Sequence, residues 1–181
     1  MKRMELIRGL HALDRVGAYV LSKRDIEKMF PGEGEKSMEK SLSRMVSDGL
    51  LVRVCKGVYL NPTASSKSSR ILEDIALALR PGSYSYVSLE SMLSEYGVIS
   101  QIPMSRLTVM TTGAGGTYET PYGIIEFTHT KRNPAAVIDR SVKVEGRPMR
   151  IAKKQAAVKD LLRVGRNVNM MDEEENEDGE E

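Results

Sequence analysis

Apolar residues recur at helical spacing three times within the first 50 residues of the 181-residue chain. The first stretch predicts an amphipathic helix from about residue 4 to residue 16. The second begins after Ser22, and Asp25 three residues later completes the pattern of a capping box. The third predicts a helix over Glu35–Gly49. Its apolar stripe consists of Met38, Leu42, Met45, Val46 and Leu50. Together these helices predict a small core near the start of the chain.

Alternation between apolar and polar residues replaces helical spacing after Gly49. Residues 51–60 alternate on both sides of Lys56-Gly57, which predicts a β-hairpin. Residues 18–21 predict a short strand that pairs with this hairpin. The resulting order of helix, strand, helix, helix and hairpin predicts a winged helix-turn-helix over residues 1–62.

Small hydroxyls and cations line the side of the third helix that faces away from its apolar stripe. No carboxylate occurs on this side before Asp48. Hydroxyl groups allow close approach to DNA, and cations reach guanine edges or phosphates. We therefore predict that this helix enters a major groove and that the hairpin contacts phosphates. The predicted DNA-binding residues are Lys36, Ser37, Lys40, Ser41, Arg44, Arg53 and Lys56. A winged helix can also dock on another protein, and the sequence leaves that alternative open.

The second half of the chain mixes helical and alternating patterns. A Ser-rich stretch over residues 63–69 predicts a linker, and helical spacing follows it up to about residue 96. Alternation and a final amphipathic stretch come after it. These patterns predict an α+β domain with a small antiparallel sheet over residues 70–166. Its predicted strands and last helix are Arg106–Thr112, Ile124–Thr130, Ser141–Glu145, Pro148–Ala152 and Lys153–Val164.

The net charge of +2 hides an uneven distribution of charged residues. Residues 172–181 carry eight carboxylates and no cation, and the rest of the chain has 27 Lys and Arg against 17 Asp and Glu. We therefore predict a disordered acidic tail over residues 167–181 and a polyanion as the partner of the folded part. A further basic surface is predicted in the second domain. Its residues are Lys131, Arg132, Arg147, Arg150, Lys153 and Lys154.

Residue types suited to catalysis or metal binding are sparse. Cys55 is the only cysteine, so neither a disulfide nor a cysteine-rich metal site is expected. The two histidines, His11 and His129, fall in separate predicted domains, which argues against a Cys–His nucleophile. We predict a protein that is not an enzyme and that has no catalytic residue, cofactor or metal. A metal-dependent nuclease built on carboxylates such as Glu119 and Glu126 is the weaker alternative.

The start of the chain places charged residues between its apolar ones, so we predict no signal peptide. No stretch of the sequence approaches the roughly 20 apolar residues that span a bilayer. We therefore expect a cytoplasmic protein without a membrane partner.

Four segments, taken in their order and spacing, resemble one known family. They are GVYLNP at Gly57–Pro62, SYVSLESMLSEYGVISQIP at Ser85–Pro103, LTVMTT in the first strand of the second domain, and IIEFTHT after Tyr122-Gly123. The chain resembles the AbiEi-family antitoxins, which are transcriptional regulators of type IV (AbiE) toxin–antitoxin systems in phage defence. The resemblance covers nearly everything from residue 5 to about residue 165.

The resemblance implies a winged helix that binds repeats in its own promoter as double-stranded operator DNA and represses its operon. It also implies a C-terminal domain that supplies antitoxicity and assists operator binding. The toxin would be a nucleotidyltransferase-like protein that is opposed without a stable complex. On operator DNA we also expect cooperative binding or a dimer. The alternative is an interaction module that neutralises a toxin by direct binding.

Overall fold

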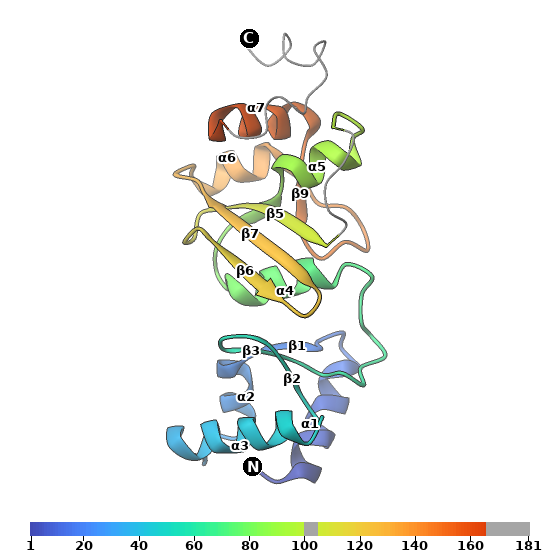
Figure 1. Ribbon diagram of the computed structural model, residues 1–181, viewed down its shortest axis with the longest axis vertical. Helices are drawn as coiled ribbons and strands as arrows, with labels where there is room; N and C mark the ends of the chain where they lie inside the picture. Colours follow the sequence, from blue (N-terminus) through green and yellow to red (C-terminus); the bar gives the residue numbers. More distant parts are fainter. Residues whose placement is uncertain (100–104, 166–181) are drawn as a thin grey trace. The chain divides into compact units, whose positions relative to one another are not determined.

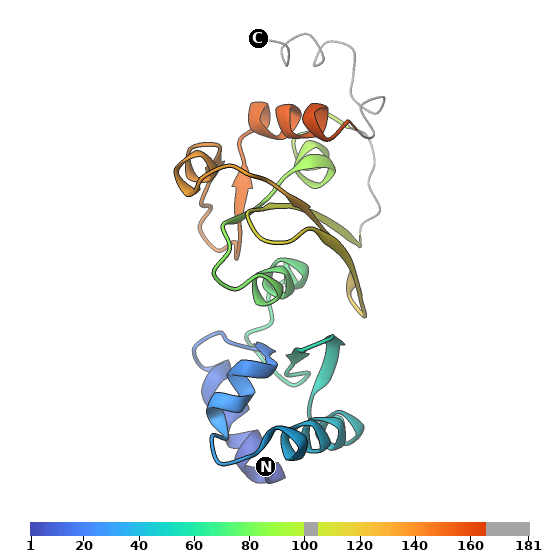
Figure 2. The ribbon, with the colours of Figure 1, turned by 90° about the vertical axis from the view of Figure 1, so that its left-hand side faces the viewer.

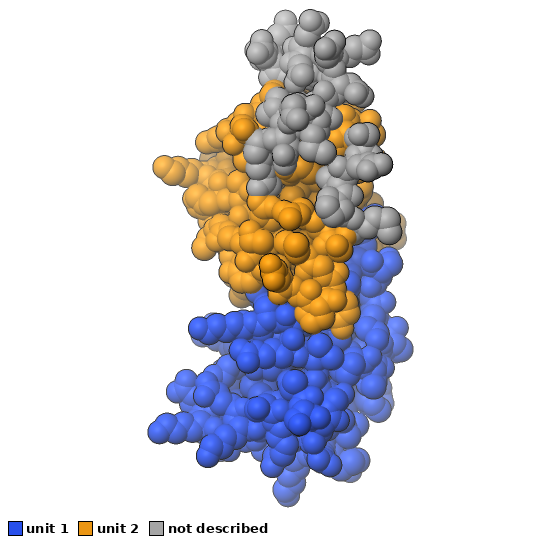
Figure 3. Space-filling model, in the orientation of Figure 1, with its two compact units in different colours: residues 1–79 blue, residues 80–181 orange. Residues whose placement is uncertain are grey.

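The computed structural model describes residues 1–99 and 105–165, which fold into two compact units. Unit 1 comprises residues 1–79 and unit 2 begins at Arg80, as Figure 3 shows by colour. The sequence placed the division at a linker over residues 63–69, so the structure moves it ten residues downstream of that linker's end. The predicted acidic tail lies outside the described residues.

Unit 1 combines four helices with a three-stranded antiparallel sheet in the order β1-β3-β2 (Figures 1 and 2). The β2–β3 hairpin turns at Gly57, whose φ of 78° lies in the left-handed region that favours glycine. The predicted order of helix, strand, helix, helix and hairpin is therefore present. The elements are α1 (Arg3–Asp14), β1 (Val20–Ser22), α2 (Lys23–Met29), α3 (Glu35–Ser47), β2 (Val52–Cys55), β3 (Val58–Leu60) and α4 (Ile71–Leu79).

A capping box starts α2, as the sequence predicted. The Ser22 hydroxyl accepts a hydrogen bond from the Asp25 amide at 3.2 Å, and the Asp25 carboxylate accepts one from the Ser22 amide at 3.0 Å. Two amide groups at the start of the helix thereby gain partners. Loss of such a cap costs about 1 kcal/mol. The local sequence thus fixes where α2 begins.

The core of unit 1 forms where α1, α2, α3 and the sheet meet. Each helix contributes the apolar positions that its spacing predicted, and Ile26, Met38 and Met45 have no exposed surface. Burying an aliphatic side chain of this size contributes about 1.5–3 kcal/mol to the free energy of unfolding. The cluster consists of Leu6, Leu10, Leu21, Ile26, Met38, Leu42, Met45, Leu51 and Tyr59.

The stretch predicted as a linker is fastened to unit 1 by hydrogen bonds. The Asp14 carboxylate accepts from the backbone amides of Ser65 at 2.9 Å and Ser66 at 3.0 Å. The Tyr19 hydroxyl accepts from the Ser68 amide at 3.1 Å and donates to Asp74 in α4 at 2.6 Å. These contacts explain why α4 belongs to unit 1 rather than to the second domain.

Unit 2 is built on a six-stranded sheet in the order β6-β7-β5-β4-β9-β8 (Figure 1). The strands β5 and β7 run parallel, as do β4 and β9, while the other neighbours are antiparallel. The unit 2 elements are β4 (Ser85–Val87), α5 (Leu89–Glu95), β5 (Arg106–Thr111), β6 (Gly116–Thr120), β7 (Gly123–His129), α6 (Pro134–Asp139), β8 (Ser141–Val142), β9 (Arg150–Ala152) and α7 (Lys154–Val164).

The α+β class is therefore confirmed, and the sheet predicted to be antiparallel is mixed, with three antiparallel and two parallel strand pairs. The sequence missed β6, a polar strand that forms a hairpin with β7 on the side away from β5. The chain runs back along β6 before it enters β7, so β7 is antiparallel to β6 and parallel to β5. The sequence also missed α6, which Asn133 caps by accepting a hydrogen bond from Ala136 at 2.8 Å.

The helices α5 and α7 pack together over one face of the unit 2 sheet (Figures 1 and 2). The β4 strand passes directly into α5 through Leu89, a fully buried residue with a φ of 56°. A bulky side chain in that region costs on the order of 1–3 kcal/mol, and burial holds it there. Hydrogen bonds in both directions between the two serines Ser88 and Ser91 and Thr108 on β5 fix the turn.

Candidate nucleic-acid interface

The exposed side of α3 carries a ridge of cations and hydroxyls. Lys36, Lys40, Ser43 and Ser47 follow one another at intervals of four, three and four residues, and all four are exposed. Met38, Leu42 and Met45 are buried on the opposite side. We call Lys36, Lys40, Ser43 and Ser47 the outer ridge. The side of α3 that faces water is therefore rotated by about one residue from the predicted DNA-binding side, which carried Ser37, Lys40, Ser41 and Arg44.

Ser41 does not belong to this exposed side, so its predicted contact with DNA is corrected. Its side chain is buried and donates a hydrogen bond to the carboxylate of Glu33, just before α3. The Ser37 hydroxyl donates to the same carboxylate oxygen at 2.9 Å. The Met1 amino group, then Ser41 and Ser37, lower the pKa of Glu33 to about 2. Both serines therefore orient the start of α3.

Arg44 lies on the flank of α3 that turns toward α1. It is exposed, and its guanidinium donates a hydrogen bond to the Met1 carbonyl oxygen at 3.2 Å. Of the predicted contacts on α3, Lys36 and Lys40 therefore lie at the centre of the exposed side, whereas Ser37 and Arg44 lie at its edge.

A groove of about 430 Å³ separates α3 from the β2–β3 hairpin. The α3 helix and the hairpin form its walls, and Lys23 closes one end from the start of α2. Arg53 and Lys56, which were predicted from the hairpin alone, both line it. The lining residues are Lys23, Glu39, Ser43, Val46, Arg53, Lys56, Gly57 and Tyr59.

Four cations of this region are free to bind an anion from outside the chain. Lys36, Lys40, Arg53 and Lys56 are exposed, and no residue in the described part of the chain pairs with them. The groove also holds a carboxylate that the sequence reasoning did not weigh. Glu39 accepts a hydrogen bond from Lys23 at 3.1 Å, and this contact is the main cause that raises the pKa of Lys23.

The additional basic surface predicted for unit 2 is reduced to its three lysines, because its three arginines are used inside the unit. Arg147 is buried and holds Glu95 through two contacts of 2.7 and 2.9 Å. Arg150 donates to the Ser141 hydroxyl and carbonyl oxygens, each at 2.8 Å. Lys131, Lys153 and Lys154 are the predicted members that remain exposed.

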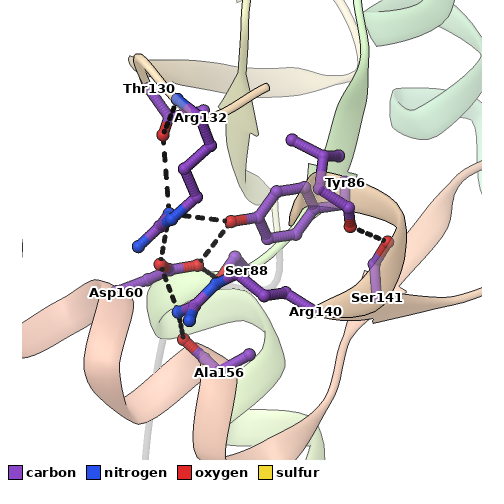
Figure 4. Close-up of polar contacts among 9 residues, drawn as sticks. Tyr86, Ser88, Thr130, Arg132, Arg140, Ser141, Ala156 and Asp160 are labelled. Atoms are coloured by element: carbon purple, nitrogen blue, oxygen red, sulfur yellow. Dashed lines mark hydrogen bonds and ion pairs between the residues drawn. The ribbon is translucent and has the colours of Figure 1, made fainter. Parts of the chain in front are cut away.

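Arg132 belongs to a buried network around Asp160, which Figure 4 draws. The Asp160 carboxylate has no exposed surface and forms ion pairs with Arg132 at 2.8 Å and Arg140 at 3.0 Å. Tyr86 and Ser88 donate to its other oxygen at 2.8 and 2.9 Å. Burial, then the charge of Asp160, raises the pKa of Tyr86 to about 12.

The sequence reasoning missed Asp160 although one signal was present. Asp160 shares one side of α7 with the apolar residues Ala156 and Leu161, and all three are buried. A carboxylate on an apolar helix face must find cations or donors when it is buried. From that rule we could have predicted that arginines pair with Asp160. Those arginines would then not have been assigned to the additional basic surface of unit 2.

The carboxylates weighed for a nuclease are not gathered into a site. Glu126 pairs with Arg106 at 3.0 Å, and Glu119 is exposed on β6. Across residues 1–99 and 105–165, no group of three or more His, Cys, Asp or Glu side chains is placed to hold a metal ion. Of the helices that the structure describes, none is long and apolar enough to cross a membrane.

Comparison with known proteins shows a likeness in fold. No protein-family model matches the chain, and no curated protein matches it. The crystal structure of the RV2827C protein from Mycobacterium tuberculosis is similar to it, with a TM-score of 0.53 at 15% sequence identity. The match covers 89% of this chain and 61% of that protein, so this chain spans less than two thirds of its length. At this identity the likeness shows an α+β fold that the two chains share.

Proposed function

We propose that this protein is a sequence-specific DNA-binding repressor and that unit 1 is its winged helix-turn-helix. The order of α1, β1, α2, α3, β2 and β3, with β1 paired to the hairpin, supports this proposal. In such an arrangement α3 would enter a major groove and the hairpin would lie beside it as the wing. Double-stranded operator DNA is then the partner of unit 1.

The observation that carries the proposal is the set of unpaired cations around the groove. Lys36 and Lys40 project from α3, and Arg53 and Lys56 project from the hairpin on the other side of the groove. Cations that have no internal partner can neutralise phosphates, and each phosphate contact adds to affinity and to its dependence on salt. Ser43 and Ser47 of the outer ridge add small hydroxyls that suit close approach to base edges.

We further propose that the repressor is the antitoxin of a type IV toxin–antitoxin system, because its sequence resembles the AbiEi family. In this proposal it regulates its own operon and opposes a nucleotidyltransferase-like toxin in the cytoplasm without a stable complex. Much of the resemblance falls on residues 85–95, which form β4, the buried turn at Leu89 and α5. Those residues serve the core of unit 2, so the surface that supplies antitoxicity lies elsewhere on it.

A gel-shift experiment on the DNA upstream of the chain's own gene tests the DNA-binding half. The full chain should bind this DNA more tightly than a shuffled sequence. The double variant Lys40→Glu/Arg53→Glu should lose binding, whereas Lys131→Glu, which reverses one exposed cation of unit 2, should retain it. Wild-type binding by the double variant would overturn the proposal.

Co-expression with the product of the neighbouring gene tests the antitoxin half. We expect growth to be restored without recovery of a complex in a pull-down at high salt. A complex that survives high salt would instead favour direct binding of the toxin. In that case unit 1 would act as a docking module on a protein rather than on DNA.

A further inference from the structure

A single carboxylate lies among the cations of the groove. Of the groove residues in the described chain, Glu39 alone is acidic, and 63% of its side chain is exposed. Its Oε1 atom lies 3.1 Å from the Nζ atom of Lys23. No described residue donates to its Oε2 atom, so that oxygen has a free acceptor position. Glu39 thus presents a hydrogen-bond acceptor on the side of α3 that faces the groove.

Stability of unit 1 does not account for this carboxylate. The ion pair with Lys23 is open to water, and exposed pairs of this kind contribute little to the free energy of unfolding. Lys23 also lies 3.8 Å from Glu27 one turn along α2, so it would keep a carboxylate neighbour without Glu39. A negative charge on a helix that faces a polyanion weakens binding at every sequence unless it gains a specific partner.

Base edges in the major groove offer such a partner. A glutamate accepts a hydrogen bond from the N4 amino group of cytosine, and no phosphate can donate one. We infer that Glu39 is a specificity-determining residue that reads a cytosine in the operator, and that Lys23 is the positioning residue that holds its carboxylate. This inference rests on the proposed DNA-binding function. It assigns the hairpin cations Arg53 and Lys56 to phosphates, and Glu39 to a base.

Selection from duplexes with a randomised central segment tests the inference on the full chain. Wild-type protein should enrich sites with cytosine at one position for each bound unit 1. Glu39→Ala should accept any base there, with a loss of roughly tenfold in discrimination. Its preferences at the other positions should be unchanged. Lys23→Met should reduce the same single preference, a change that loss of a merely structural ion pair would not produce.

Glu35→Gln is the matched control, because it removes an equally negative and exposed side chain from α3 without touching the groove lining. It should keep the cytosine preference and raise affinity for all duplexes slightly, because it removes one negative charge from a helix that faces DNA. Retention of the preference by Glu39→Ala would overturn the assignment of Glu39 and leave the DNA-binding function standing. Failure of the wild-type chain to bind any duplex would overturn both.

Discussion

The two units use their cations in opposite ways. In unit 1, Lys36, Lys40 and Lys56 reach water with no partner in the described chain. In unit 2, Arg132 and Arg147 bind carboxylates inside the fold. The difference follows from chemistry, since a planar guanidinium with five donors satisfies several buried acceptors and a hydrated ammonium stays in water. The comparison teaches that a basic composition indicates a binding surface only where the cations lack internal partners.

The sharpest test of the internal role is Asp160→Ala. The change leaves Arg132 and Arg140 without their shared carboxylate, and breaking a buried pair in this way costs about 3–5 kcal/mol. We expect unit 2 to lose that much free energy of unfolding, measured by hydrogen exchange of amides in β4 and β5. Asp139→Ala, at an exposed position on α6, is the control and should change little. If the amides of β4 and β5 were equally protected from exchange in both variants, the arginines around Asp160 would not stabilise unit 2, and the contrast with the free cations of unit 1 would be lost.

Lys40 is an exposed cation of unit 1 with no partner in the described chain, so Lys40→Ala should lower DNA affinity and leave the free energy of unfolding unchanged. Removal of this cation from the outer ridge should cost about 1–3 kcal/mol on the operator if Lys40 reads a base edge, and less if it contacts a phosphate. Fluorescence anisotropy with labelled operator DNA measures the loss. Lys131→Ala removes an exposed cation from unit 2 and should have a smaller effect. A larger effect from Lys131→Ala would shift the interface to unit 2.

Lys56→Ala should produce a smaller and sequence-independent change. Lys56 lies at the tip of the hairpin, where we assign it to a phosphate, so operator and random DNA should lose affinity equally. The slope of log affinity against log salt should fall by about one. Titrations at several salt concentrations give this slope. A slope equal to that of the wild type would remove Lys56 from the interface.

The smallest expected effect concerns the start of α3 in acid. The pKa of Glu33 falls from an ordinary value of 4.5 to about 2, so its contribution to stability is complete above pH 4.5 and is lost as the pH falls toward 2. Thermal unfolding between pH 5 and about 2 should show this loss. It should be absent in Glu33→Gln and present in Glu35→Gln, which changes an exposed carboxylate of the same helix.

The elements of unit 1 could be predicted because their signals are local. Helical spacing placed α1 and α3 within two residues at each end, and the capping box located the start of α2. The face of α3 was harder to assign. Ser41 is small and polar, and only the position of Glu33 in the preceding turn reveals that it points inward. Spacing alone therefore placed the exposed side of α3 about one residue away from its position in the structure.

Unit 2 was less predictable because its structure depends on distant partners. The β6 strand is short and polar, and its pairing with β7 decides that β7 runs parallel to β5. Arg147 appears as a surface cation in the sequence because Glu95 lies 52 residues away along the chain. In the candidate site, the sequence singled out Arg53 and Lys56, which line the groove, but it did not single out the groove carboxylate Glu39.

The parallel pairing of β4 with β9 has a consequence for how the protein is made. Val87 pairs with Ile151, and Tyr86 next to it needs Asp160 for its hydroxyl. At ordinary rates of translation the ribosome takes about 4–15 s to cover that interval. During this time one edge of β4 has no neighbour, and an unpaired strand edge is a template for pairing with another chain. Slowly translated codons placed between Tyr86 and Asp160 should therefore lower the yield of folded unit 2.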